Sequence, residues 1–113
     1  MIENDLSCSE NEFPSEFKAV LEIFCADEEL RTKTLPHVNF DSHEINWYEI
    51  GRNHFGSGHS AAIAWAKAIW TDCLPEHIDL FERAFSMDHR IRQAVLKALG
   101  IRWALTPKVK TGG

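Results

Sequence analysis

One stretch, Ser57 to Thr71, constrains the fold of this chain more than any other. Five of its fifteen residues are alanine, the amino acid with the strongest preference for the α-helix. At about 100° per residue, the side chains of Ser60, Lys67 and Thr71 share one narrow strip with Ala64, and mainly apolar residues take most of the remaining circumference. A helix that is apolar over so much of its surface is buried by its neighbours. We therefore expect a central buried helix over residues 57–74, ended by Pro75.

Apolar residues at helical spacing predict further helices around this one. These helices cover residues 15–30, 42–55, 75–85 and 88–99. Asp88 is the expected N-cap of the last one, and Gly100 is its expected end. Residues 101–105 alternate in polarity, which is compatible with a short extended segment over the core. The pattern predicts an all-α fold, a bundle of about five helices in a single domain spanning residues 1–113.

The helix over residues 42–55 has the clearest local start signal. Asp41 and Glu44 fit the spacing of a capping box, and Phe40 and Ile45 fit the hydrophobic staple that often accompanies one. The preceding residues, 31–39, lack periodicity and contain a proline, so we expect a loop there.

Charge is distributed unevenly along the chain. The net charge is −5, yet residues 1–49 hold twelve acids and three bases, whereas residues 50–113 hold five acids and nine bases. Residues 1–12 are acidic without an apolar pattern, which predicts a loose arm, and residues 106–113 predict a disordered basic tail.

Three further features bear on the compartment. The N-terminus lacks the basic residues of a signal peptide. The longest unbroken apolar run, Ala61–Ala66, is far shorter than the roughly 20 residues that cross a bilayer. The three cysteines, Cys8, Cys25 and Cys73, show no CxxC spacing. We therefore expect a cytoplasmic protein that has neither a disulfide framework nor a membrane partner.

The turn before the central helix is the first candidate for a small-ligand site. A glycine-rich turn that opens a helix offers free N–H groups to an anion, and two histidines flank this one. The candidate residues are His54, Gly56, Ser57, Gly58 and His59. A tight turn could also bring His54 and His59 together as a metal or catalytic site, although no HExxH or nucleotide-binding motif accompanies them. We expect no bound cofactor.

The basic C-terminal third gives a second hypothesis. Two helices between residues 76 and 99, joined by a short connection, have the outline of a helix-turn-helix whose second helix enters the major groove of DNA. The candidate contacts to nucleic acid are Arg90, Arg92, Lys97 and Arg102. The acidic chain as a whole lacks the strongly basic balance of most nucleic-acid-binding domains.

These observations favour a binding module without catalysis, whose partner is a protein, a second copy of the chain or a small ligand. Strong structural signals occur here without a catalytic constellation. Nucleic-acid binding through the basic third is the alternative, and an enzyme or metal site at His54 and His59 is the second alternative.

Overall fold

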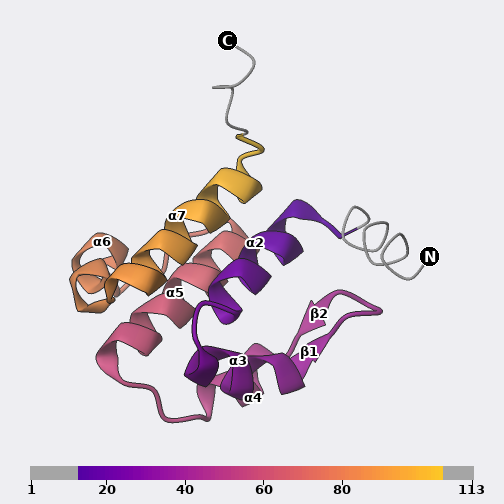
Figure 1. Cartoon of the computed structure of the whole chain (residues 1–113), viewed down its shortest axis with the longest axis horizontal. Coiled ribbons are helices and arrows are strands. Elements are labelled where there is room, and N and C mark those ends of the chain that lie inside the picture. The colour runs from indigo at the N-terminus through magenta and orange to yellow at the C-terminus, as the bar shows by residue number, and fades with distance from the viewer. Residues whose placement is uncertain (1–12, 106–113) are drawn as a thin grey trace.

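Three helices carry most of the core. In the computed structural model, which describes residues 13–105, they are α2 (Ser15–Phe24), α5 (Ser57–Thr71) and α7 (His89–Arg102). Figure 1 shows these three helices lying next to one another, and α2 and α7 pack against each other and against α5. The predicted helical class is confirmed, although the described residues form six α-helices and one small two-stranded sheet instead of a bundle of about five helices.

Alanines let the neighbours of α5 approach closely. Ala61, Ala62 and Ala66 are completely buried, as expected for the central helix. The helix ends at Thr71, however, three residues earlier than predicted. Asp72 takes the left-handed conformation at φ 59°, and its N–H bonds to the carbonyl of Ala68. This cap stops the helix before Pro75 is reached.

The predicted helix over residues 15–30 is in fact two helices. Helix α2 ends at Phe24, and α3 (Glu28–Thr34) starts after Asp27, whose carboxylate accepts the N–H of Leu30. The acidic run that follows Asp27 therefore lies at a helix N-terminus, where the helix dipole favours negative charge. A short 3₁₀ turn, η1 (Leu35–His37), follows directly, so the loop predicted for residues 31–39 is mostly helical.

The predicted helix over residues 42–55 is wrong. The strands β1 (Val38–Asn39) and β2 (Glu44–Ile45) pair antiparallel in its place. The side-chain oxygen of Asn39 accepts the N–H groups of Asp41 and Ser42, and His43 turns the chain with φ 61°. The only helix in this segment is α4 (Trp47–Gly51), capped by Asn46.

Aromatic rings fasten the hairpin to α2. Phe40 and His43 both lie against the ring of Phe17, with ring centroids 5.9 and 5.1 Å away. Behind them Trp47 packs edge-on against Phe24 at 5.7 Å. Because these contacts need the side chains of the hairpin to face α2, tertiary packing overrides the local capping signal.

The second half of the chain confirms the Asp88 cap and shifts the other boundaries. Asp79, not Pro75, starts α6 (Leu80–Arg83), which continues as a 3₁₀ turn, η2 (Ala84–Ser86). Asp88 then accepts the N–H of Ile91 at the start of α7. The hairpin predicted for residues 76–99 thus begins at Leu80 and ends at Arg102.

The extended segment predicted for residues 101–105 is also wrong. Helix α7 continues through Gly100 to Arg102 and ends in a Schellman motif. In this motif Ala104 takes φ 59°, its N–H bonds to the carbonyl of Ile101, and the N–H of Leu105 bonds to that of Gly100. The left-handed residue of the motif is thus Ala104 instead of Gly100, which lies inside the helix.

Within residues 13–105 no helix has the length and apolar character needed to cross a bilayer. The predicted acidic arm, residues 1–12, and the predicted basic tail, residues 106–113, lie outside the part of the chain that the structure describes.

Candidate functional site

The predicted ligand-binding turn lies where α5 meets α3. Gly56 is the N-cap of α5 in an extended conformation, and Ser57, which is exposed, is the first helical residue instead of the cap. The ring of His54 faces solvent, while its carbonyl accepts a 2.6 Å hydrogen bond from the Nζ of Lys33. The turn is therefore tied to α3 through its backbone.

His59 belongs to a cluster of charged groups at the same junction. Its Nε2 lies 2.7 Å from an oxygen of Asp27, and its Nδ1 lies 3.5 Å from an oxygen of Glu29. Burial raises the pKa of Asp27, but the N–H of Leu30 and the imidazole of His59 outweigh it and hold that pKa below its ordinary value. A hydrogen bond from Lys33 lowers the pKa of Glu29 as well.

This cluster explains what the histidine does in the fold. Asp27 caps α3 and holds a residue of the first turn of α5, so one carboxylate joins the starts of two helices. The negative charges of Asp27 and Glu29 also lie beside the N-terminus of α5, the place that an anionic ligand would take. Within residues 13–105, no group of three or more His, Cys, Asp or Glu side chains is arranged to hold a metal ion.

Close packing accounts for Gly58. A Cβ at this position would lie 2.6 Å from the carbonyl oxygen of Ser86 and 3.5 Å from the Cα of Met87. Glycine is thus required for the first turn of α5 to approach the segment between η2 and α7. An anion-binding turn and this backbone contact both call for glycine, and sequence alone does not separate them.

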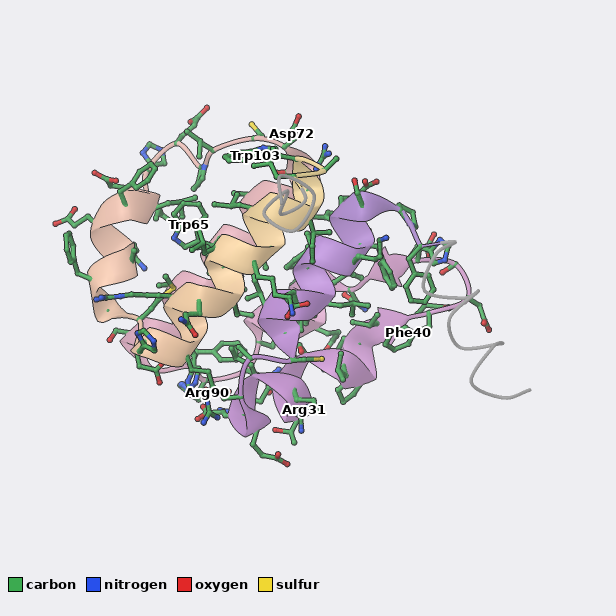
Figure 2. The ribbon with its side chains drawn as sticks, turned by 45° about the horizontal axis from the view of Figure 1, so that its top comes forward. Arg31, Phe40, Trp65, Asp72, Arg90 and Trp103 are labelled. Atoms are coloured by element: carbon green, nitrogen blue, oxygen red, sulfur yellow. The ribbon has the colours of Figure 1, made fainter. Side chains whose placement is uncertain are left out.

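The four basic residues of the nucleic-acid hypothesis do not form one surface. Arg90 and Arg102 are separated by about 18 Å along α7 at 1.5 Å per residue, and Figure 2 shows Arg90 and Trp103 at opposite ends of this helix. Lys97 pairs with Glu22 of α2 at 3.3 Å. Arg92 donates hydrogen bonds to the carbonyls of Ala84 and Phe85 instead.

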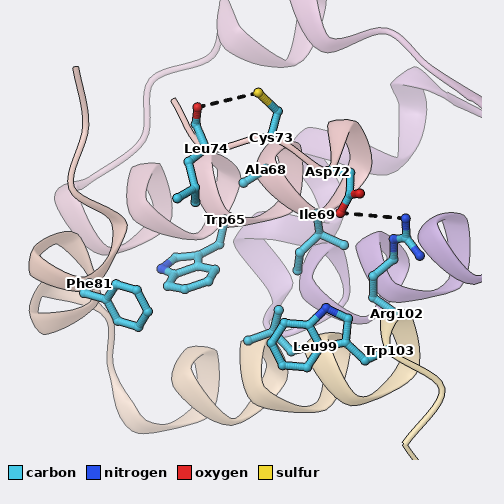
Figure 3. Close-up of a pocket in the computed structure, with 10 residues that line it drawn as sticks. All are labelled: Trp65, Ala68, Ile69, Asp72, Cys73, Leu74, Phe81, Leu99, Arg102 and Trp103. Atoms are coloured by element: carbon cyan, nitrogen blue, oxygen red, sulfur yellow. Dashed lines mark hydrogen bonds and ion pairs between the residues drawn. The ribbon is translucent and has the colours of Figure 1, made fainter. Parts of the chain in front are cut away.

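An apolar cavity of about 440 Å³ lies between α5, α6 and α7 at the C-terminal ends of α5 and α7. We refer to it as the α5–α6–α7 cavity. Its lining comprises Trp65, Ala68, Ile69, Asp72, Cys73, Leu74, Phe81, Leu99, Arg102 and Trp103. Figure 3 shows Trp65 and Ile69 of α5 facing Leu99 and Trp103 of α7, with Phe81 of α6 at one side. The volume is within the range of small-molecule sites.

Local structure holds the walls of this cavity in place. The left-handed cap at Asp72 ends α5, so that Cys73 and Leu74 lie outside the helix and reach the cavity. The indole N–H of Trp65 donates to the carbonyl of Leu80 at 3.1 Å and thereby fixes the start of α6. The ring of Phe81 stands edge-on to that of Trp65, with centroids 5.5 Å apart.

Large apolar side chains are exposed at the rim. The exposed fractions are 69% for Leu74, 73% for Phe81 and 61% for Trp103. A second hollow of about 430 Å³ lies next to the first and shares Ala68, Cys73 and Leu74 with it. Exposed apolar side chains that gather around a hollow mark a place where a partner or ligand binds.

One ion pair supplies the charge of the cavity. An Nη of Arg102 lies 3.8 Å from a carboxylate oxygen of Asp72, whose side chain is 77% exposed. The Nε of Arg102 is buried and has no hydrogen-bond partner among the described residues. At such a distance the pair is an electrostatic contact without a hydrogen bond, so the guanidinium retains unused donors.

The sequence contained one signal for this region, an excess of apolar residues on α7. Leu96, Leu99 and Trp103 are spaced to share one side of α7, next to the buried side that packs against α2. Leu96 and Trp103 are exposed and Leu99 is half-buried, although an apolar residue at these spacings is usually assigned to the core. Their excess over what the core needs is the signal.

The chain matches no protein-family model, and comparisons with curated proteins and with solved structures find no match either.

Proposed function

We propose that the chain is a binding module without catalysis and that the α5–α6–α7 cavity is its binding site. The observation that carries the proposal is an apolar hollow open to solvent and rimmed by exposed leucine, phenylalanine and tryptophan side chains. Each of these side chains would gain about 1.5–3 kcal/mol if it were transferred completely from water to an apolar surrounding. A ligand that covers the rim gains part of that free energy.

The walls support the proposal because they are preformed. The cap at Asp72 fixes the end of α5, and the Trp65–Leu80 hydrogen bond joins α5 to α6. The two hydrogen bonds from Arg92 to the carbonyls of Ala84 and Phe85 join α7 to η2, which continues α6. A ligand then binds without ordering the site first, which removes one of the main costs of association.

The two alternatives have weaker support. Binding to nucleic acid needs several unpaired basic side chains on one surface of the protein, yet Lys97 and Arg92 have partners within the fold. Acid–base chemistry at His59 needs a ring nitrogen that can reach a substrate, yet both nitrogens face carboxylates. Both alternatives remain hypotheses.

Filling the cavity tests the proposal. Ala68 lines both hollows, whereas Ala64, one turn earlier on the same helix, lines the second hollow only. We expect Ala68→Leu to weaken binding of an apolar fluorescent dye, anilinonaphthalene sulfonate, by about tenfold or more, because one leucine occupies much of the space that the dye needs. Ala64→Leu is the matched control and leaves dye binding at the first hollow unchanged.

The dye titration has an outcome that contradicts the proposal. Equal dye binding by the wild type and Ala68→Leu, with both proteins folded by circular dichroism, would show that the dye binds elsewhere. The α5–α6–α7 cavity would then lose its assignment as the binding site.

A further inference from the structure

The charged end of the α5–α6–α7 cavity narrows the class of ligand. We infer that the site takes an apolar carboxylate, whose chain or ring fills the cavity and whose carboxylate binds the guanidinium of Arg102 in place of Asp72. This inference rests on the proposed function, because it assigns the chemistry of a ligand to the same cavity.

Arg102 is the first step of the argument. Within residues 13–105 its guanidinium has one contact with an acid, at 3.8 Å, and its Nε is buried without a partner. A guanidinium presents parallel N–H donors that match the two oxygens of a carboxylate. Rotation of the terminal torsions of Arg102 would turn these donors toward a ligand in the cavity that it lines.

Asp72 is the second step. Its side chain is mostly exposed, and an exposed ion pair contributes little to stability. A ligand carboxylate therefore displaces Asp72 at little cost, and the aspartate side chain moves into water. The side chain of Arg102 itself is only 28% exposed, so its guanidinium is partly sheltered from solvent.

The remaining lining sets the number of charges. Apart from Arg102 and Asp72, the polar groups of the lining are the thiol of Cys73 and the indole N–H groups of two tryptophans, none of them charged at neutral pH, and the rest is aliphatic or aromatic. One guanidinium balances one negative charge, so a monoanion fits and a dianion such as a phosphate monoester leaves a charge uncompensated. The length of the hollow beyond Arg102 is left for apolar atoms.

The experiment uses three probes that share an eight-carbon chain. Octanoate, octanol and octylamine at pH 7 carry a negative, a neutral and a positive head group. The tryptophan fluorescence of the protein, to which Trp65 and Trp103 of the lining contribute, reports their binding. We expect octanoate to bind about 10- to 100-fold more tightly than octanol, the range of one charge-assisted hydrogen-bonded pair. Octylamine should bind no more tightly than octanol.

Two variants should move the affinity for octanoate in opposite directions. Arg102→Gln removes the guanidinium and should weaken octanoate binding about 10- to 100-fold while octanol binding is unchanged. Asp72→Asn keeps a residue that tolerates the left-handed cap and removes the competing charge, so octanoate should bind a few-fold more tightly. Arg102→Lys keeps the positive charge near the helix C-terminus but lacks the planar guanidinium. Its affinity for octanoate should lie between those of the wild type and Arg102→Gln.

A labelling measurement tests the proposed binding site separately from its preference for a carboxylate. Cys73 lines the cavity, and Cys25 is an exposed cysteine outside the lining. A bound probe should slow modification of Cys73 by a maleimide and leave that of Cys25 unchanged, as read by peptide mass.

Different results would contradict the carboxylate inference and the proposed binding site. Equal protection of Cys73 by all three probes, with no effect of Arg102→Gln, would overturn the carboxylate inference and leave the apolar site in place. Absence of protection by every probe, together with unchanged fluorescence, would contradict the proposed function itself.

Discussion

Gly58 gives the sharpest test of how the helices pack. A methyl group at this position would lie 2.6 Å from the carbonyl oxygen of Ser86, a backbone atom that is held by the chain on both sides. Overpacking of this kind costs about 1–3 kcal/mol. Alanine in place of glycine would return up to about 1 kcal/mol through its better helix propensity. We therefore expect Gly58→Ala to destabilise the fold by about 1–2 kcal/mol, against the usual trend for helices.

Gly100 is the matched control. It lies inside α7 with an ordinary helical backbone, and a Cβ there would meet only the carbonyl oxygen of Leu105, at 4.0 Å. Nothing opposes the gain in helix propensity at this position, so Gly100→Ala should stabilise the protein by about 0.5–1 kcal/mol. The two variants make the same chemical change and should differ in sign.

Thermal unfolding followed by circular dichroism measures both variants. At about 4–8 °C per kcal/mol for a domain of this size, Gly58→Ala should lower the Tm by about 4–16 °C and Gly100→Ala should raise it by about 2–8 °C. An increase in the Tm of both variants would refute the reasoning. It would mean that the segment at Ser86 moves aside freely and that α5 and the start of α7 are not in close contact.

Three other predictions test the core, a cap and the charged cluster. Ala66→Asp places an unpaired charge where the side chain is completely buried, so calorimetry should show no cooperative transition within a few degrees of the wild type. Asp88→Ala removes the carboxylate that accepts the N–H of Ile91 and should cost about 1 kcal/mol in urea denaturation, and an unchanged midpoint would contradict the cap. Because the pKa of Asp27 is lower in the folded protein than its ordinary value near 3.8, its charge stabilises the fold above that value, and the stabilisation is lost as the pH falls through the folded-state pKa. Asp27→Asn keeps a capping oxygen and removes the charge. The wild type should therefore be more stable than this variant at pH 6, and the difference should shrink below about pH 4. A difference independent of pH would count against the contact of Asp27 with His59.

The elements that the sequence predicts well are those decided by neighbours along the chain. The buried face of α5 follows from its alanines, and the start of α7 follows from Asp88. The region from Phe40 to Ile45 fails because its capping signal is local and the decisive contacts are not. Phe40 packs against Phe17, more than twenty residues earlier, and Asn39 supplies an oxygen to the turn that the capping pattern assigns to Asp41.

The candidate site illustrates the same limit. Gly58 and His59 stand out in the sequence because glycine and histidine each have several structural and functional uses. In the structure their contacts are with Ser86 and Asp27, which no spacing rule connects to them. The α5–α6–α7 cavity depends on the left-handed turn at Asp72 and on how far α7 extends past Gly100, and both are set by backbone geometry.

The packing of α2 against α7 has a consequence for folding during synthesis on the ribosome. Between the last residue of α2 and the last residue of α7, synthesis adds roughly 80 residues, which takes about 4–16 s at about 5–20 residues per second. Throughout that interval the side of α2 that packs against α7 in the finished fold lacks its cover. Apolar helix surface that stays uncovered for several seconds can bind chaperones, and the nascent chain should release them once α7 has emerged.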